Sequence, residues 1–249
     1  MIRAVVFDPV GTLAWRRDAN APRDYDEALA STGLELDPIV FGRWRHRLMG
    51  AAHPEASASR EAYERWWAAR RAELWDRVPL DPAAAARLAA ALAVADAPEL
   101  VAAPGATDAL AALAGLGVRT VAAGNAGWDL ADDLAALGLT RGLDAVLTSA
   151  RVGWRKPHAP FYRAVFEACG ARPAELLLVS TDRGRDVVGA LAVGAAAAVL
   201  APSEPPSRWA VEPRRVAPSR PGVLNVASLD ALVAEVAVRR GLDPPGEAG

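Results

Sequence analysis

The chain has 249 residues, 52% of them hydrophobic and 23% charged, so it can bury a substantial core in one domain or in one domain with an insertion. A formal net charge of −2 excludes a generally basic surface for nucleic acid, and no apolar run approaches the roughly 20 residues needed to span a bilayer. The single cysteine, Cys169, excludes an internal disulfide and indicates a reducing compartment. We therefore expect a cytoplasmic chain without a membrane or nucleic-acid partner.

The first predicted element is a short buried strand over residues 2–7, followed directly by a carboxylate and a glycine turn. Gly11 supplies the backbone freedom that a sharp exit from the strand requires. Asp8 is then placed at the carboxyl end of the strand, where open α/β sheets bind their ligands. A simple strand-ending turn capped by Asp8 is the structural alternative.

The next segment, residues 16–99, is predicted to be helical throughout, which is too long for an ordinary crossover between two strands. Helices are expected at residues 25–32, 38–52, 59–77 and 82–95. Four tryptophans at helical spacing indicate the core of a small bundle: Trp44, Trp66, Trp67 and Trp75. We interpret this segment as an inserted helical domain.

From residue 100 onward, predicted helices and strands alternate. Strands are expected at residues 118–123, 145–147, 176–180, 196–200 and 223–226, and helices at 106–116, 128–137, 159–169, 186–194 and 228–240. Such alternation is typical of a largely parallel sheet covered on both faces. The expected fold is an α/β, Rossmann-like three-layer core of residues 1–15 and 100–240, with a proline-rich loop near 202–221 and a frayed tail at 241–249.

Residues 7–13, with the sequence FDPVGTL, resemble the first motif of the haloacid dehalogenase-like (HAD) hydrolase superfamily, which usually reads Asp-x-Asp-Gly-Thr. The resemblance implies that Asp8 is a nucleophile that forms a covalent aspartyl intermediate, that Thr12 helps to bind the substrate, and that the helical insertion is the cap of the family. Val10 departs from the pattern. It occupies the position where phosphatases of the family carry their general acid, and valine cannot transfer a proton.

The second and third motifs of the family resemble residues 121–126 (VAAGNA) and 153–157 (GWRKP). Asn125 is retained, but Gly124 replaces the usual serine or threonine, so only a backbone amide can donate there. The resemblance implies substrate binding by Gly124 and Asn125. It implies that Lys156 is catalytic and balances the negative charge of Asp8 and the substrate.

The fourth motif resembles residues 178–190, in which Asp182 and Asp186 follow a predicted strand. In the family such acids bind magnesium, so the resemblance implies a Mg²⁺ site made of Asp8, the backbone carbonyl of Val10, and Asp182 or Asp186. Thr181 occupies the place where one common spacing has the metal-binding acid. Alternatively, arginines at 183 and 185 neutralise these acids in ion pairs.

Three functions follow from the resemblance, each with a small molecule as the partner. The first is a magnesium-dependent hydrolase of a phosphate ester or anhydride with a good leaving group, because Val10 cannot protonate a poor one. The second is a metal-independent dehalogenase, because halide leaves without a proton. The third is a non-catalytic binding protein, which the departures at Val10, Gly124 and Thr181 would permit. The first is the preferred hypothesis from the sequence.

Overall fold

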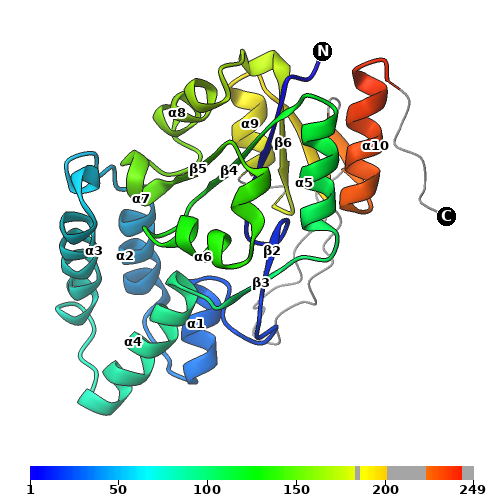
Figure 1. Cartoon of the computed structure of the whole chain (residues 1–249). Helices are drawn as coiled ribbons and strands as arrows, with labels where there is room; N and C mark the ends of the chain where they lie inside the picture. The colour runs from blue at the N-terminus through cyan, green and yellow to red at the C-terminus, as the bar shows by residue number, and fades with distance from the viewer. Residues whose placement is uncertain (183–185, 201–222, 243–249) are drawn as a thin grey trace.

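The fold is built around a six-stranded, fully parallel sheet with the order β5-β4-β1-β6-β7-β8 (Figure 1). The computed structural model describes residues 1–182, 186–200 and 223–242. The strands are β1 (Ala4–Phe7), β4 (Arg119–Gly124), β5 (Ala145–Thr148), β6 (Leu176–Ser180), β7 (Ala196–Leu200) and β8 (Val223–Val226). β1 lies between β4 and β6, so the residue after Phe7 emerges at the centre of the sheet.

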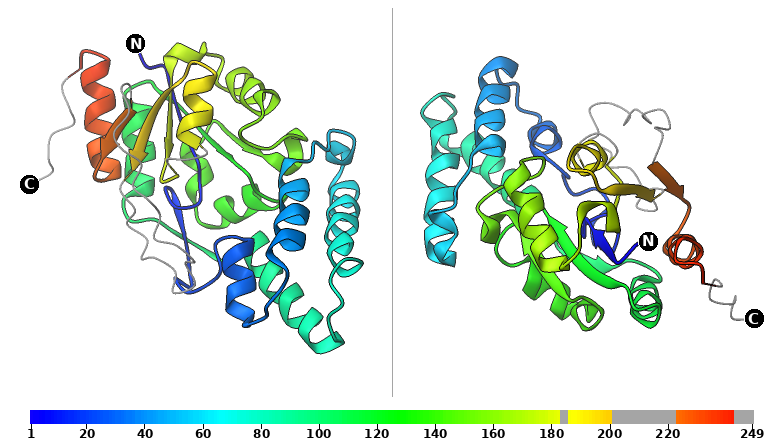
Figure 2. Two further views of the ribbon diagram at one scale, coloured as in Figure 1. Left: turned by 180° about the vertical axis from the view of Figure 1, so that it is seen from behind. Right: turned by 90° about the horizontal axis from the view of Figure 1, so that it is seen from above.

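Helices cover both faces of this sheet, as the view from above shows (Figure 2). Side chains alternate along β1: Val5 and Phe7 pack with α5 (Ala106–Gly115), α6 (Leu130–Ala136) and α10 (Leu229–Arg239). Ala4 and Val6 pack on the opposite face. That face is covered by α8 (Ala159–Cys169) and α9 (Val188–Ala192). The result is a three-layer α/β core.

Four helices between the first and third strands form a separate cluster at the left and lower left of Figure 1. They are α1 (Tyr25–Thr32), α2 (Pro38–Gly50), α3 (Arg60–Trp75) and α4 (Pro82–Asp96). Each begins after a residue whose side chain accepts backbone N–H groups: Asp24, Asp37, Ser59 and Asp81. Their own hydrophobic core contains Trp44, which stacks on Tyr25.

The observed fold class confirms the expected one, and the strands predicted at 176–180, 196–200 and 223–226 coincide with β6, β7 and β8. The sequence pattern did not indicate β2 (Ala14–Arg16) and β3 (Leu100–Ala102), which pair antiparallel. It also missed the four-residue helix α7 (Ser149–Val152). These elements are too short for a periodic pattern, and β2 and β3 depend on pairing between segments far apart in the chain.

Some predicted features lie outside the described residues. These are the arginines at 183 and 185, the loop at 202–221, and residues 243–249 of the predicted tail. In the part of the chain that is described, no helix is long and apolar enough to cross a bilayer.

Candidate active site

Asp8 begins a tight loop at the carboxyl end of β1. The backbone N–H of Asp8 donates to the carbonyl of Val179 (2.9 Å), and the hydroxyl of Thr12 donates to the backbone carbonyl of Asp8. In the structure, the Thr12 hydroxyl therefore shapes this loop. Gly11 has a φ of +96°, and a Cβ there would lie 3.0 Å from the Thr181 hydroxyl. The Asp8 side chain is 19% exposed, which leaves it reachable by a small molecule.

Lys156 provides the counter-charge and is the only lysine of the chain. Its side chain is 1% exposed, and Nζ lies 2.9 Å from Oδ1 of Asp8 and 3.2 Å from Oδ2 of Asp186. Asn125 holds the Lys156 backbone from both sides: its Oδ1 accepts the Lys156 N–H (2.7 Å), and its Nδ2 donates to the Lys156 carbonyl (3.1 Å). The structure thus brings together four residues singled out from the sequence.

Burial of Lys156 lowers its pKa, but the two adjacent carboxylates outweigh burial and raise the pKa above its ordinary value. The ammonium therefore stays protonated at neutral pH. Asp186 is fully buried, and its Oδ2 also accepts from the hydroxyl of Ser180 (2.8 Å), which in turn accepts the backbone N–H of Asp182 (3.0 Å). The sequence analysis gave Ser180 no role, although a polar residue ending a buried strand was an available signal.

Gly124 ends β4 beside the nucleophile loop, and its lack of a side chain has a steric reason. A Cβ at this position would lie 3.1 Å from Cδ of Pro9 and 3.3 Å from Oδ1 of Asp8. Both distances are tighter than ordinary van der Waals contact. The pyrrolidine ring of Pro9 thus crowds the position of a Cβ at residue 124, so the unusual residues at 9 and 124 accommodate each other.

The expected magnesium ligands do not assemble a metal site among the described residues. That part of the chain contains no group of three or more His, Cys, Asp or Glu side chains that could hold a metal ion. Asp8 and Asp186 converge on the Lys156 ammonium instead. Val10 and Asp182 are half-buried. Magnesium therefore stays a prediction of the phosphatase hypothesis, and no chemical step below uses it.

The segment that carries Lys156 also contacts the helical insertion. Arg155 is buried, lies with its guanidinium carbon 5.6 Å from the ring centroid of Trp67 on α3, and donates to the Ser149 hydroxyl (3.4 Å). The ring of His53 donates through Nε2 to the carbonyl of Ser149 (3.0 Å). Burial lowers the pKa of His53, which favours its neutral form. Cationic and aromatic side chains therefore join the insertion to the strand ends beside the site.

The model of the haloacid dehalogenase-like hydrolase family matches residues 2–194. The chain belongs to this family. No curated protein matches the chain. Among solved structures, an HAD phosphatase from Thermococcus onnurineus is 20% identical with a TM-score of 0.55, covering 98% of this chain and 100% of its own.

L-2-haloacid dehalogenase from Xanthobacter autotrophicus is also similar, at 28% identity and a TM-score of 0.53, covering 96% of this chain and 99% of its own. A structure of that enzyme with chloropropionic acid covalently bound is 26% identical, with a TM-score of 0.52 and the same coverage. Solved structures similar to this HAD-like hydrolase thus include a phosphatase and a dehalogenase.

Proposed function

We propose that this HAD-like hydrolase breaks the carbon–halogen bond of a small 2-haloacid through Asp8, without a metal ion. The observation that carries the proposal is the Asp8 carboxylate held 2.9 Å from a buried lysine ammonium. The loop offers no proton donor at Val10, and halide is a leaving group that needs none. The L-2-haloacid dehalogenase from Xanthobacter autotrophicus, at 26% and 28% identity in its two structures, supports this substrate class.

In the first step, an oxygen of the Asp8 carboxylate attacks the carbon that bears the halogen. A carbon–oxygen bond forms, the carbon–halogen bond breaks, and the halide departs with the bonding electrons, which leaves an ester of Asp8. The hydrogen bond from Lys156 to Oδ1 orients the carboxylate for this attack. No proton changes place, so valine at position 10 is compatible with the step.

In the second step, the oxygen of a water molecule attacks Cγ of the Asp8 ester. The bond between Cγ and the ester oxygen breaks, one proton of the water goes to the departing 2-hydroxyacid, and the other goes to solvent. The Lys156 ammonium stabilises the negative charge that develops on the acyl oxygen. Asp8 returns as a carboxylate with one oxygen derived from water.

The phosphatase hypothesis makes different demands on the same residues. Phosphate esters with poor leaving groups need a proton donor, which Val10 does not supply, and the expected magnesium would need ligands beyond Asp8 and Asp186. The structural likeness to the phosphatase, at 20% identity, concerns the fold. Phosphate-ester hydrolysis is therefore the competing outcome in the assay.

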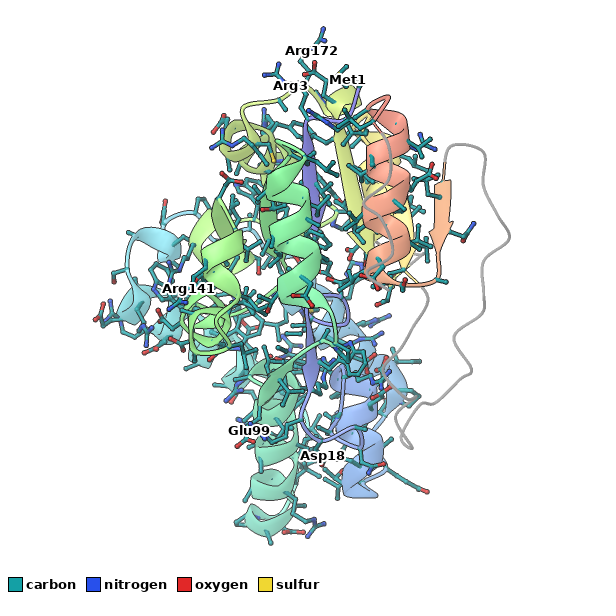
Figure 3. The ribbon with its side chains drawn as sticks, turned by 45° about the vertical axis from the view of Figure 1, so that its right-hand side comes forward. Met1, Arg3, Asp18, Glu99, Arg141 and Arg172 are labelled. Atoms are coloured by element: carbon teal, nitrogen blue, oxygen red, sulfur yellow. The ribbon has the colours of Figure 1, made fainter. Side chains whose placement is uncertain are left out.

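The test measures halide released from L-2-chloropropionate by the full chain in the presence of EDTA, and phosphate released from p-nitrophenyl phosphate with magnesium. We expect halide release that EDTA does not reduce and that falls below detection in Asp8→Asn. Asp18→Asn, at an exposed aspartate labelled in Figure 3, is the matched control and should keep full activity.

A single turnover in ¹⁸O-labelled water examines the intermediate. The label should enter the Asp8 side chain, detected by mass spectrometry of the peptide, and not the first 2-hydroxyacid molecule released. Label in that first product would exclude the ester intermediate. Phosphate release that requires magnesium, without halide release, would favour the phosphatase, and no turnover of either compound would favour a binding protein.

A further inference from the structure

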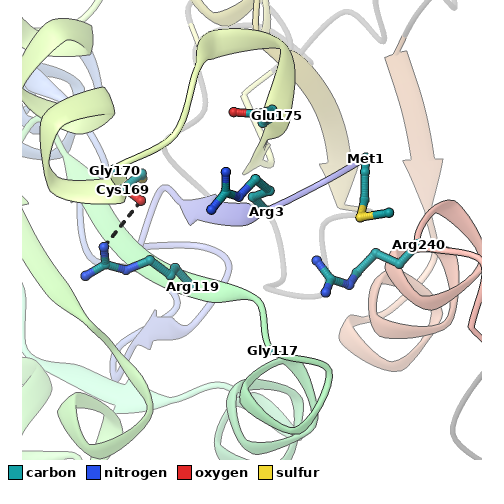
Figure 4. A pocket seen from close by; sticks show the side chains of 8 residues that line it. All are labelled: Met1, Arg3, Gly117, Arg119, Cys169, Gly170, Glu175 and Arg240. Carbon is teal, nitrogen blue, oxygen red and sulfur yellow. Dashed lines mark hydrogen bonds between the residues drawn. The ribbon is translucent and has the colours of Figure 1, made fainter.

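A second concave site lies at the opposite edge of the sheet from Asp8. It is a pocket of about 540 Å³ at the amino ends of the central strands (Figure 4). Arg3 precedes β1 and Arg119 begins β4, while Arg240 follows α10. Five residue steps separate Arg3 from Asp8, which in an extended strand is roughly 16 Å. The pocket is therefore separate from the candidate active site.

The pocket is strongly cationic although the chain carries a net charge of −2. Its lining contains three arginines, Arg3, Arg119 and Arg240, and one carboxylate, Glu175. The Glu175 carboxylate is already occupied by Arg172, whose side chain and backbone N–H both donate to it at 2.9 Å. These hydrogen bonds, together with the nearby positive charges of Arg172 and Arg3, hold the pKa of Glu175 at about 2, so the single carboxylate of the lining is ionised and shared between two arginines.

The arginines retain unused hydrogen-bond donors. The side chain of Arg3 makes no hydrogen bond or ion pair with any residue that the structure describes. Arg240 donates from Nη1 to the Ile2 carbonyl (2.7 Å), but its buried Nε has no hydrogen-bond partner within the described chain. Within the described residues, the polar contacts of the Arg119 side chain are long, 3.5 Å to the Cys169 carbonyl and 3.7 Å to the Asp144 carboxylate.

A purely structural explanation accounts for part of this arrangement. Arg119 and Arg240 each direct one N–H group to a backbone carbonyl, and a guanidinium has five donors. Arg3 has no such contact, and in Figure 4 its guanidinium lies between those of the other two. Carbonyl capping therefore leaves most guanidinium donors of the three arginines without a hydrogen-bond acceptor among the described residues.

We propose that this pocket binds a small phosphorylated molecule that carries two or more negative charges. Guanidinium groups match phosphate oxygens with paired, charge-assisted hydrogen bonds. The volume falls within the range of about 300–1,000 Å³ that is usual for small-molecule sites. A bound anion would accept hydrogen bonds from the Arg3 guanidinium, which donates to no described residue, and would add negative charge between the three arginines.

The test is calorimetric titration of the metal-free full chain with inorganic pyrophosphate as the probe. Because a hydrogen bond to a charged group contributes about 1.5–3 kcal/mol, we expect Arg3→Gln and Arg240→Gln each to weaken binding about tenfold or more. Arg141→Gln removes an exposed arginine far from the pocket (Figure 3) and should leave the dissociation constant unchanged. Circular dichroism of each variant verifies folding.

Asp8→Asn separates this pocket from the active site. Loss of a negative charge would strengthen pyrophosphate binding in the catalytic cleft, whereas binding in the arginine pocket should not change. The proposal is overturned if the probe does not bind, if Arg3→Gln and Arg240→Gln bind as tightly as the natural chain, if Arg141→Gln is equally weakened, or if Asp8→Asn binds more tightly. These outcomes do not depend on the dehalogenase proposal.

Discussion

The two edges of the parallel sheet differ in how their charged side chains are compensated. At the carboxyl edge, Lys156 and Asp186 are almost fully buried and satisfy each other together with Asp8. At the amino edge, Arg3 is exposed and has no described ion pair. A buried charge needs a counter-charge inside the fold, because its desolvation is otherwise too costly. An exposed cationic edge can leave that counter-charge to solvent or to a ligand.

The largest effect is expected from Lys156→Met, which removes the cation from the carboxyl edge. Two carboxylates would remain near each other without compensation, one of them fully buried. Breaking a buried pair typically costs about 3–5 kcal/mol, so urea unfolding at pH 7 should show a loss of that size together with loss of turnover. Arg3→Met at the amino edge is the comparison and should change stability by less than about 0.5 kcal/mol. Equal losses of stability in Lys156→Met and Arg3→Met would contradict the difference between the two edges.

Val10→Asp adds a proton donor to the carboxyl edge. General acid catalysis is typically worth about 10²- to 10⁴-fold, so any turnover of alkyl phosphates should rise within that range. Turnover of 2-haloacids should not rise, because halide needs no proton. Parallel assays of alkyl phosphate, aryl phosphate and haloacid measure the difference. An equal gain for aryl and alkyl phosphates would contradict the proton-donor explanation.

Gly124→Ala examines the steric match between β4 and the nucleophile loop. The new Cβ would press on Pro9 and on Asp8 Oδ1, so we expect lower turnover and a stability loss of about 1–3 kcal/mol. Pro9→Ala removes the ring and should restore part of the loss in the double variant. Additive effects of the two substitutions would show that their contact has no energetic importance.

The smallest perturbation is a change of pH. The titration of Lys156 can be measured by itself because the chain has a single lysine. Selective ¹³C labelling of lysine gives one side-chain NMR signal, and its titration should occur above the ordinary pKa of 10.5. Because the folded pKa is the higher one, the pair stabilises the fold fully below the unfolded value. That contribution is lost as pH rises through the folded pKa, so stability should fall at alkaline pH. A signal that titrates below 10.5 would contradict the coupling to Asp8 and Asp186.

Sequence patterns were sufficient for the fold class, for most element boundaries, and for the residues around Asp8. Hydrophobic periodicity is a local property, and aspartate–proline pairs mark helix starts wherever they occur, as at α2 and α4. The order of the motifs predicts that Asp8, Asn125 and Lys156 surround one site at the carboxyl ends of the strands. Parallel strands bring such ends to one edge of the sheet.

Three features depended on residues that meet only after folding. Pro9 and Gly124 are 115 positions apart in the sequence, and only their contact explains the missing hydroxyl. Ser180 gained a role through its bond to Asp186, and Arg3, Arg119 and Arg240 form one pocket although they are distributed over almost the whole chain. Steric fit and charge compensation depend on distances between atoms in space. The energies of these interactions fall off steeply with distance, so they cannot be inferred from positions along the chain.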